Sequence, residues 1–501
     1  MTLPAACPAP FNLARYVLDA GRATPEKTAL AVLGPRRAEC WSYDSLRRRV
    51  FGMATALQSR GIQPDDRVLL RIGNEPAFPV AFLGCALIGA IPVPSSAQLT
   101  EHEITKLAAD LNPHAVIASD GLACPRHPAR LMSAEALIEN PATEPPAVQL
   151  GDPNRPGYIV YTSGSGGQPR AVVHAHRAVW ARRMMIDGWY GLGPEDRMCH
   201  AGALNWTFTL GTGLLDPWAV GASALIPGKD VAPAQLPQLL KRHNATIFAA
   251  VPGIYRKMLK SGLPQMPGLR HGLSAGETLP PALRAAWQSA TGTDIHEALG
   301  MSECSTFISG SPARPAPAGS TGFAQAGRRV AILAEDGTPA PTGTPGRLAV
   351  HKTDPGLMLG YWSQTEAPRL PLEAEWFVTG DQVQSATNGA ITFKARLDDI
   401  LNAGGFRVAP QEIEAAFAGL PGLGECAACE IALRADTRII ALAIEGEAGF
   451  AELKARAQTR LAAYKQPRVY VRLPELPRSA NGKLARARLA ELVKEHYDDP
   501  P

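Results

Sequence analysis

Short apolar runs alternate along the chain with longer segments whose apolar residues recur at helical spacing. Runs such as "RVLLRIG" at 67–73 and "ATIFAAVP" at 245–252 are typical of short buried strands. Between such runs, "YDSLRRRVFGMATALQSRG" at 43–61 has the period of an amphipathic helix and ends at a glycine. This alternation predicts an α/β architecture over most of the chain.

A different pattern begins near residue 396. The preceding stretch, 311–346, is rich in proline, glycine and alanine, which favours turns between short strands. Beyond it the spacing predicts a helix over Ala409–Ala418, strands over 429–435 and 438–446, and a helix over Ala451–Ala462. We therefore expect a large layered α/β domain over 1–395 and a small α+β domain over 396–501.

Composition and charge narrow the possible function classes. The 501 residues are 46% hydrophobic and carry a net charge of +4, with charged residues dispersed along the chain. Such a balance supports a large core and argues against a nucleic-acid partner. The first residues lack a basic start followed by an apolar run, and "VAFLGCALIGAIPVP" at 80–94 is too short to span a bilayer. The run at 80–94 predicts a buried helix that leads into a strand. Because neither a signal segment nor a membrane span is predicted, we expect a cytoplasmic protein without a membrane partner.

The cysteines give little support for a metal centre. Eight are scattered along the chain, and the one close pair, Cys426 and Cys429, has no second pair or histidine nearby to complete a zinc site. We therefore expect buried thiols in a reducing compartment.

The stretch "YTSGSGGQPRAVVHAH" at 161–176 carries the first candidate for binding chemistry. Small residues follow a predicted strand: Thr162, Ser163, Gly164, Ser165, Gly166 and Gly167. Glycines let backbone N–H groups converge and hydroxyls add donors, which suits phosphate oxygens. The loop does not fit the Walker pattern, and Pro169 stands where the helix of a dinucleotide fingerprint would begin. Taken alone, the segment is also compatible with a flexible surface turn.

Further segments, in order along the chain, decide between these interpretations. They are "SAGETLP", "ALGMSE", "VTGD", "ARLDDILNAGGFRVAPQEIE" and "PRSANGKLAR". With the loop, they resemble the signatures of adenylate-forming enzymes, the superfamily of acyl-CoA synthetases, amino-acid adenylation domains and firefly luciferase. The resemblance covers essentially the whole chain, and it implies a small C-terminal domain that is mobile.

The resemblance implies a two-step reaction. A carboxylate attacks the α-phosphorus of ATP to give an acyl-adenylate and pyrophosphate, and the thiol of coenzyme A then displaces AMP. Because the first step brings two anions together, the site must neutralise charge, and Mg²⁺ is the implied metal. The implied ATP-binding residues are Thr162, Ser163, Gly164, Ser165, Gly166, Gly167, Arg170, Gly276, Glu277, Leu299, Gly300, Ser302, Asp381 and Arg396.

The resemblance also assigns individual roles. Lys483 is expected to bridge the attacking carboxylate and the α-phosphate, and Glu303 is expected to bind Mg²⁺ through a hard carboxylate oxygen. Asp381 would accept hydrogen bonds from the ribose hydroxyls. Asp398 matches the hinge about which the small domain turns between the half-reactions. Gly404 and Gly405 would line the channel for CoA, where a side chain would block the thiol.

Several positions depart from the superfamily pattern. Ser165 and Gly166 replace paired threonines, so one hydroxyl is lost, and Arg170 stands for a lysine that it can replace at phosphate. Leu299 replaces a tyrosine that stacks on adenine, and Ser302 replaces a threonine. None of these changes removes a charged group that the chemistry requires, although they leave room for reduced activity. The superfamily often has a histidine in the "HAH" segment, so His174 and His176 are not expected to bind a metal.

The acyl pocket is expected near "HAGALNWTFTLGTGLLDPWAVGA" at 200–222, whose wording resembles benzoate and medium-chain acyl-CoA ligases. The candidate pocket residues are Asn205, Trp206, Ala249, Val251 and Gly276. No aspartate stands in "ALNWTFT" to hold a substrate ammonium group, which disfavours an amino acid. We therefore expect an aromatic or short- to medium-chain acid as substrate, and a monomer or homodimer.

Two other functions remain open at this stage. The enzyme could load a carrier protein instead of CoA, or the chain could be a nucleotide-binding protein with degenerate catalysis.

Overall fold

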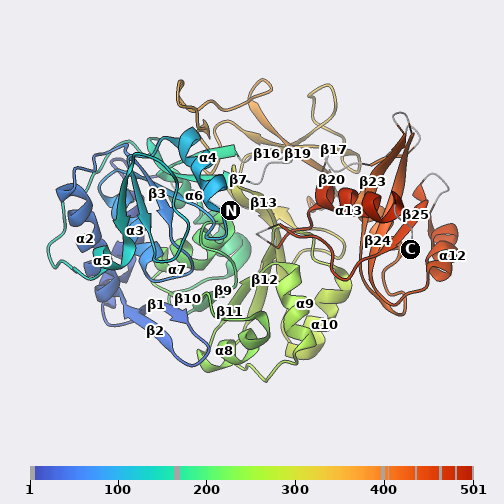
Figure 1. Cartoon of the computed structure of the whole chain (residues 1–501), viewed down its shortest axis with the longest axis horizontal. Coiled ribbons are helices and arrows are strands. Elements are labelled where there is room, and N and C mark those ends of the chain that lie inside the picture. The colour runs from blue at the N-terminus through green and yellow to red at the C-terminus, as the bar shows by residue number, and fades with distance from the viewer. Residues whose placement is uncertain are drawn as a thin grey trace. The chain divides into compact units, whose positions relative to one another are not determined.

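The computed structural model describes residues 6–162, 170–396, 401–403, 406–434, 437–461, 465–479 and 482–498. The chain forms two compact units (Figure 1). The first comprises Met1–Val330, Val350–Phe377 and Gly389–Ile391, and the second comprises Ala331–Ala349, Val378–Asn388 and Thr392–Pro501. The expected domain boundary between residues 395 and 396 stays a prediction.

A nine-stranded sheet forms the centre of the first unit. Its order is β15 (Phe323–Ala324), β14 (Ser305–Ser309), β13 (Ile295–Met301), β12 (His271–Ala275), β11 (Ile247–Ala250), β9 (Arg197–His200), β10 (Ser223–Pro227), β1 (Thr28–Leu33) and β2 (Ala38–Ser42). The strands from β13 to β1 are parallel, whereas β2, β14 and β15 pair antiparallel at the two edges.

Both faces of the parallel strands are covered, which explains why they read as short continuous apolar runs. On one face, Phe248 packs with Trp287 and Met258 from helices α10 (Pro281–Thr291) and α9 (Pro252–Lys260). On the other face, Leu273 packs with Trp189 and Phe208. The predicted strand over 245–252 is confirmed.

Two smaller sheets complete the first unit. The parallel sheet β4–β3–β5–β6 contains Ile91–Pro94, Arg67–Arg71, Ala115–Ala118 and Arg130–Ser133, and the antiparallel sheet β18–β8–β7 contains Gly360–Tyr361, Arg170–Ala175 and Pro156–Thr162. Apolar side chains such as Val93 and Ile159 pack these two sheets in one cluster.

The helices of the first unit follow the predicted spacing. They are α1 (Leu13–Asp19), α2 (Tyr43–Ser59), α3 (Ala77–Leu87), α4 (Glu101–Leu111), α5 (Ala134–Ile138), α6 (Arg177–Ala181), α7 (Asp216–Ala219), α8 (Leu236–Arg242), α9 and α10, with 3₁₀ turns η1 (Ala20–Ala23) and η4 (Pro233–Gln235) and π turns η2 (Ile186–Tyr190) and η3 (Thr209–Leu215). Helix α2 begins where the Ser42 hydroxyl accepts the Ser45 N–H, and it ends before Gly61, whose φ is +84°. Helix α3 is buried along its whole length and precedes β4, as predicted.

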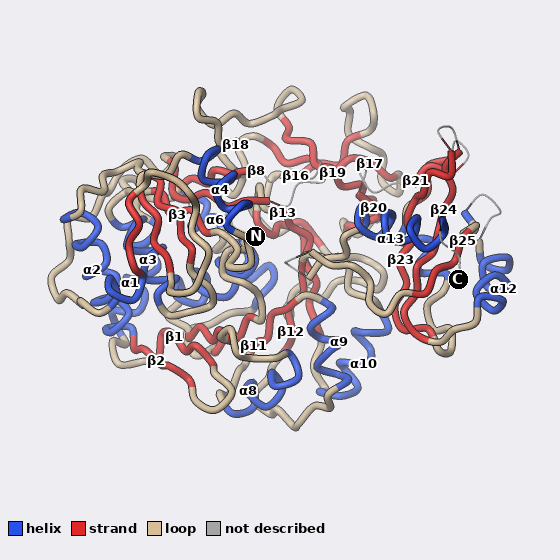
Figure 2. The backbone as a smooth tube through the Cα atoms, in the orientation of Figure 1, coloured by secondary structure: helices blue, strands red, loops and turns tan. Residues whose placement is uncertain are grey.

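The second unit contains the C-terminal sheet with helices on both faces. Its strands are β23 (Leu423–Arg434), β24 (Thr437–Gly446) and β25 (Val469–Arg472), and its helices are α11 (Pro410–Ala416), α12 (Phe450–Arg460) and α13 (Arg486–Asp498) (Figure 2). Helices α11 and α12 pack on one face and α13 on the other. The unit also holds most of the sheet β16–β17–β19–β20 (Val330–Leu333, Pro345–His351, Trp376–Ser385 and Ile391–Arg396) and the hairpin β21–β22 (Leu401–Ala403 and Phe406–Val408). The elements predicted between 409 and 462 are confirmed.

Cys426 and Cys429 lie on β23 and belong to the two opposite apolar clusters of this sheet. Residues three apart in a strand point to opposite faces, so these two sulfurs do not converge. Cys429 is buried and Cys426 is partly buried, and burial raises the pKa of both thiols to about 12.

None of the helices in the described ranges combines the length and the apolar character that a membrane crossing requires.

Candidate active site

The carboxyl ends of four parallel strands bring the predicted pocket residues to one edge of the nine-stranded sheet. Trp206 follows β9, Val251 follows β11 and Gly276 follows β12. Leu299 lies on β13, where Ala298 pairs with Ala275, so Gly276 follows at the level of Leu299. Figure 2 shows β11, β12 and β13 along this sheet. Ligands of open α/β sheets bind at this edge.

One face of the sheet at this edge is apolar. Ala249, Ala275 and Ala298 are buried there in a cluster with Phe208. Trp206 is partly buried against this cluster and stands edge-on to Phe208, with ring centroids 5.2 Å apart and planes at 89°. Small side chains and aromatic rings therefore make this edge of the sheet apolar, which favours an apolar group next to it over a charged one.

The buried polar groups next to this apolar edge of the sheet carry no net charge. Burial, with a smaller contribution from Arg182, lowers the pKa of His200 to about 3, so its imidazole is neutral at pH 7. Asp216 accepts two hydrogen bonds from Arg182 Nε, at 2.8 and 3.1 Å, and one from Nη2 at 2.7 Å. The carboxylate and the guanidinium therefore neutralise each other inside the protein.

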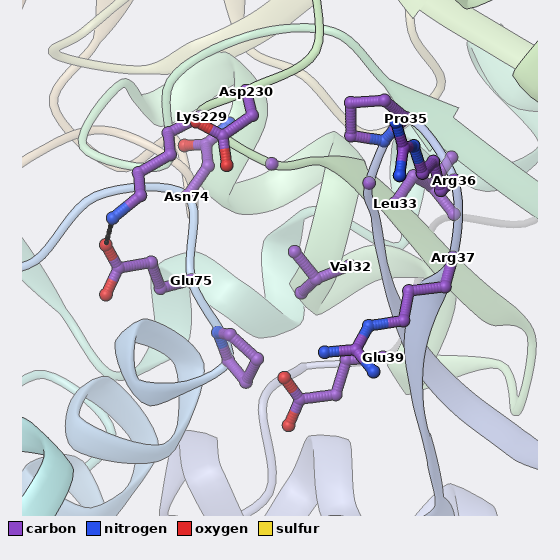
Figure 3. A pocket seen from close by; sticks show the side chains of 13 residues that line it. Val32, Leu33, Pro35, Arg36, Arg37, Glu39, Asn74, Glu75, Lys229 and Asp230 are labelled. Atoms are coloured by element: carbon purple, nitrogen blue, oxygen red, sulfur yellow. Dashed lines mark ion pairs between the residues drawn. The ribbon is translucent and has the colours of Figure 1, made fainter.

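Asn74 fixes the loop that leads to Trp206. Its Nδ2 donates to the carbonyls of Gly202 and Pro227, at 2.8 and 3.2 Å, and its Oδ1 accepts the Leu204 N–H at 3.0 Å. Asn74 also lines an open groove of about 450 Å³ beside the β1–β2 turn (Figure 3). This groove carries side chains of both signs, including a Lys229–Glu75 ion pair at 3.6 Å, and contains none of the predicted site residues.

The turn Met301–Ser305, which carries Ser302 and Glu303, is held at every position from Ser302 to Ser305. His174 Nε2 donates to the Ser302 carbonyl at 2.7 Å, and Met358 N–H donates to the Glu303 carbonyl at 2.8 Å.

The second half of this turn depends on two buried arginines. Arg328 donates to the Cys304 carbonyl at 2.8 Å, and Arg182 donates to the Ser305 hydroxyl. Ser305 has a φ of +61°, in the left-handed region that non-glycine residues rarely adopt. The surroundings therefore impose this conformation, which supports a preorganised site.

Glu303 lies in the middle of this turn, and the residue is 9% exposed. Tyr361 Oη donates to its Oε1 at 2.8 Å, and Arg170 Nη2 lies 4.0 Å from the same oxygen. Arg170 also stacks over the Tyr361 ring, with its Cζ 4.4 Å from the centroid. Burial and the Glu303 carboxylate raise the pKa of Tyr361, so its hydroxyl stays a donor at neutral pH.

The predicted phosphate loop is described only at its ends, because Ser163, Gly164, Ser165, Gly166 and Gly167 lie outside the described residues. Thr162 ends β7 and pairs with Arg170, which begins β8. Within the described part of the chain, Tyr161 Oη and Thr162 Oγ1 are buried and have no hydrogen-bond partner. Thr162 Oγ1 lies on the same face of the hairpin as its cross-strand partner Arg170, and an orphaned hydroxyl beside a guanidinium fits a bound anion, whereas Tyr161 packs into the apolar cluster on the other face.

The donor set of this site fits Mg²⁺ held with substrate. Over the described ranges, no three His, Cys, Asp or Glu side chains form a group that could hold a metal by themselves. Mg²⁺ is commonly held by one or two carboxylates together with substrate phosphates and water, and Glu303 supplies such a carboxylate. His174 has its pKa lowered to about 4, chiefly by burial, and its Nε2–H is committed to Ser302. His176 Nδ1 accepts the Leu13 N–H at 3.1 Å.

Glu297 is a buried carboxyl group two residues before Leu299. Burial raises its pKa from 4.5 to about 7, although it accepts the Leu279 N–H at 3.0 Å. The folded protein therefore favours the protonated form. The stability this gives is fully present below pH 4.5 and is lost as pH rises through 7, because the unfolded chain ionises first.

We expect Glu297→Gln to remove this pH dependence. Gln keeps an oxygen that can accept the Leu279 N–H but does not titrate. The free energy of unfolding of the wild type, relative to that of Glu297→Gln, should fall by about 2–3 kcal/mol between pH 5 and pH 8. Urea unfolding of both proteins at the two pH values measures this difference. An unchanged difference would show that Glu297 is ionised throughout.

Asn205, Glu277 and Gly300 lie in the first unit, and the other predicted residues belong to the second unit or lie outside the described residues. Asp381 is buried, and its Oδ1 lies 3.5 Å from Arg396 Nη1. Lys483 lies in a turn between β25 and α13. Asp398, Gly404 and Gly405 are outside the described residues, so the hinge and the CoA channel stay predictions.

Comparison with known proteins agrees with this fold. The family model described as AMP-binding enzyme matches residues 18–362, which is more than half of the chain. The chain belongs to the AMP-binding enzyme family. The model of the AMP-binding enzyme C-terminal domain matches residues 412–483. The predicted family and the α/β fold are thus confirmed.

Relatives of this AMP-binding enzyme include CoA ligases for aromatic acids. Benzoate–CoA ligase of Thauera aromatica is 30% identical over 482 residues, which cover 90% of this chain and 91% of that protein. A structure of a benzoate CoA ligase from Burkholderia xenovorans LB400 is 28% identical, with a TM-score of 0.83 and coverage of 96% and 100%. The anthranilate CoA ligase AuaEII in complex with anthranoyl-AMP is 25% identical, with a TM-score of 0.86 and coverage of 98% and 99%.

Several contacts of this AMP-binding enzyme were not anticipated from its sequence. Tyr361 and Arg182 reach the Met301–Ser305 turn from positions 58 and 123 residues away along the chain. Asn74 contacts Gly202 and Leu204 of the loop that leads to Trp206, at separations of 128 and 130 residues. Nothing in local spacing marks such residues.

Proposed function

We propose that this AMP-forming acid–thiol ligase uses ATP to activate an apolar, preferably aromatic, carboxylic acid and transfers the acyl group to CoA. One observation supports this proposal most: two features lie at the same sheet edge. The first is the apolar cluster that contains Ala249 and packs against Trp206, and the second is the turn after β13 that presents Glu303. The Thauera aromatica relative is named for benzoate, and this supports an aromatic substrate.

The chain's own groups account for charge neutralisation at ATP. We assign the phosphates to the loop Thr162–Gly167, where the Thr162 hydroxyl is unpaired and Arg170 is the cross-strand partner of Thr162. Glu303 would hold Mg²⁺, which when bound spreads the negative charge of the β- and γ-phosphates. Because Tyr361 and the four contacts of the turn fix Glu303, little reorganisation is needed when charge develops.

Nucleoside contacts are assigned to two groups of residues. Gly276, Glu277, Leu299, Gly300 and Ser302 follow β12 or lie on or directly after β13, at the edge where nucleotides bind in α/β sheets. Asp381 is assigned to the ribose hydroxyls, and Arg396, its ion-pair partner, would share its charge.

The small domain is assigned a role in each half-reaction. Lys483 would serve adenylation, and rotation about Asp398 would remove it and open the channel past Gly404 and Gly405 to CoA. The pairing of functions follows the resemblance of these segments to those of acyl-CoA synthetases.

A pyrophosphate-release assay with a panel of acids tests the proposal. The panel contains benzoate, anthranilate, acetate, C4 to C8 straight-chain acids, malonate and phenylalanine, each with and without CoA. An uncharged pocket gains about 0.8 kcal/mol per buried CH₂, roughly fourfold in kcat/KM, until the tail outgrows it. We expect an optimum at benzoate-like or about C4–C8 acids, with acetate, malonate and phenylalanine poor. A best rate with malonate or phenylalanine would contradict the apolar pocket.

Trp206→Ala should shift this optimum toward larger acids. Removing the indole that stands on Phe208 leaves space that benzoate does not fill. The ratio of kcat/KM for 2-naphthoate to that for benzoate should rise by about tenfold, which corresponds to about 1.4 kcal/mol. Trp180→Ala is the matched control, because Trp180 is partly buried against Phe11 and Tyr16 instead. An unchanged ratio in Trp206→Ala would remove this side chain from the pocket.

Gly276 is a poor position for a similar test. Its φ is +95°, so any side chain there strains the backbone before it reaches the substrate.

A further inference from the structure

The segment that carries Lys483 is a tight antiparallel turn. Ser479 N–H donates to the Lys483 carbonyl at 2.7 Å, and Ala485 N–H donates to the Pro477 carbonyl at 2.8 Å. Arg478 and Leu484 form the bridge between these bonds. Gly482, directly before Lys483, has a φ of +79°. The backbone of Lys483 is therefore defined by this turn and by whatever holds the turn in place.

An ion pair connects the turn to β23, an edge strand of the sheet β23–β24–β25. Arg478 Nη2 donates to both oxygens of Glu425, on β23, at 2.7 Å each. Its Nη1 donates to the Gly482 carbonyl at 2.8 Å. The side chains are only 18% and 24% exposed, so solvent screens the pair less than a surface pair. A single planar guanidinium thus links the sheet to the peptide group that precedes Lys483.

We propose that Glu425 and Arg478 are positioning residues that hold the Lys483 turn for acyl-adenylate formation. The inference rests on the proposed role of Lys483 in that half-reaction. A lysine side chain is long and flexible, so its ammonium can be placed accurately only if its backbone is fixed. A displacement of about 1 Å at a reacting centre can cost about a hundredfold in rate. Arg478 acts through Gly482 and is not assigned a contact with substrate.

A second ion pair of the same unit provides a matched control. Glu414, on α11, pairs with Arg486 at 2.7 Å, with side chains 19% and 17% exposed. Arg486 also donates to a carbonyl, that of Ala428, at 2.7 Å. The two pairs match in distance, burial and extra backbone bond, but Glu414 and Arg486 bond the N–H and the carbonyl of Ala428 on β23, whereas Arg478 bonds the Gly482 carbonyl.

The test separates the two half-reactions in the full-length enzyme. Adenylation is followed by ATP–pyrophosphate exchange with benzoate, or with the best acid of the panel if that differs. Thioester formation is followed from the corresponding synthetic acyl-adenylate and CoA. The variants are Glu425→Gln, Arg478→Gln, their double mutant, Arg478→Lys, Glu414→Gln and Lys483→Ala.

We expect Glu425→Gln and Arg478→Gln to lower kcat for exchange by at least tenfold, with KM for ATP and acid changed less than twofold. Thioester formation should stay within twofold of wild type. The double mutant should be no slower than the slower single mutant, because both substitutions break the same Glu425–Arg478 ion pair. Arg478→Lys keeps the charge but not the planar fork, so it should recover part of the rate and also serves if Arg478→Gln folds poorly. Glu414→Gln should match wild type in both assays.

Three results would overturn the proposal. Exchange within twofold of wild type in Glu425→Gln and Arg478→Gln, while Lys483→Ala is slow, would reject the positioning role of the ion pair and leave the proposed function intact. Equal losses in both half-reactions would show that the pair is merely structural. Absence of exchange in the wild type with every acid of the panel would reject the proposed function, and the positioning role of the ion pair with it.

Discussion

Replacing Lys483 with alanine is expected to slow acyl-adenylate formation by about 10²–10³-fold. Two anions, the substrate carboxylate and the α-phosphate of ATP, approach each other in this step. We propose that the Lys483 ammonium bridges them as charge develops, so its removal should act on kcat more than on KM. Pyrophosphate exchange measures the loss directly.

The same variant should form thioester from synthetic acyl-adenylate and CoA at close to the wild-type rate. Lys494→Ala is a suitable control, because Lys494 is an exposed lysine on α13 of the same unit. Equal losses of Lys483→Ala in both half-reactions would contradict the division of labour.

Breaking the buried Arg182–Asp216 pair should have the largest effect on stability. Their side chains are 5% and 3% exposed, so a single substitution leaves one charge without its partner in the interior. We expect Arg182→Met and Asp216→Leu each to lower the free energy of unfolding by about 3–5 kcal/mol. The double mutant should lose clearly less than the sum, because no unpaired charge remains. Urea unfolding of the four proteins measures this coupling.

Additive losses in that cycle would contradict the interpretation of a mutually neutralised pair. Activity gives an independent result. Arg182 also donates to Ser305, two residues after Glu303, so the stable double mutant should still adenylate more slowly than wild type. An unchanged adenylation rate would mean that the turn is fixed without Arg182.

The sequence predicted most of the fold because most elements carry a clear local pattern. The strands β3, β10, β11 and β12 are short apolar runs, and α2 has a capping serine, helical spacing and a glycine stop. Strand order could not be predicted, since β9 lies between β10 and β11 through crossover connections. The π turns η2 and η3 have no local signature either.

Candidate site residues could be proposed from the sequence where they sit in contiguous motifs, but not where they act from a distance. Glu303 and Lys483 were proposed from short segments that resemble those of a superfamily. Tyr361, Arg182 and Asn74 act on the site through contacts between distant parts of the chain, and an isolated tyrosine, arginine or asparagine is uninformative by itself. Trp206 was proposed from its segment alone, and the sheet register adds that it follows β9, whose neighbour β11 ends in Ala249 and Ala250.

One measurement tests the central claim most directly. Purified enzyme is incubated with ATP, Mg²⁺, CoA and the best acid of the panel, and the nucleotide and thioester products are quantified by chromatography. The account predicts one AMP and one acyl-CoA for each ATP consumed, and acyl-adenylate with pyrophosphate when CoA is omitted. Formation of ADP, or consumption of ATP to AMP without acyl-CoA, would contradict it.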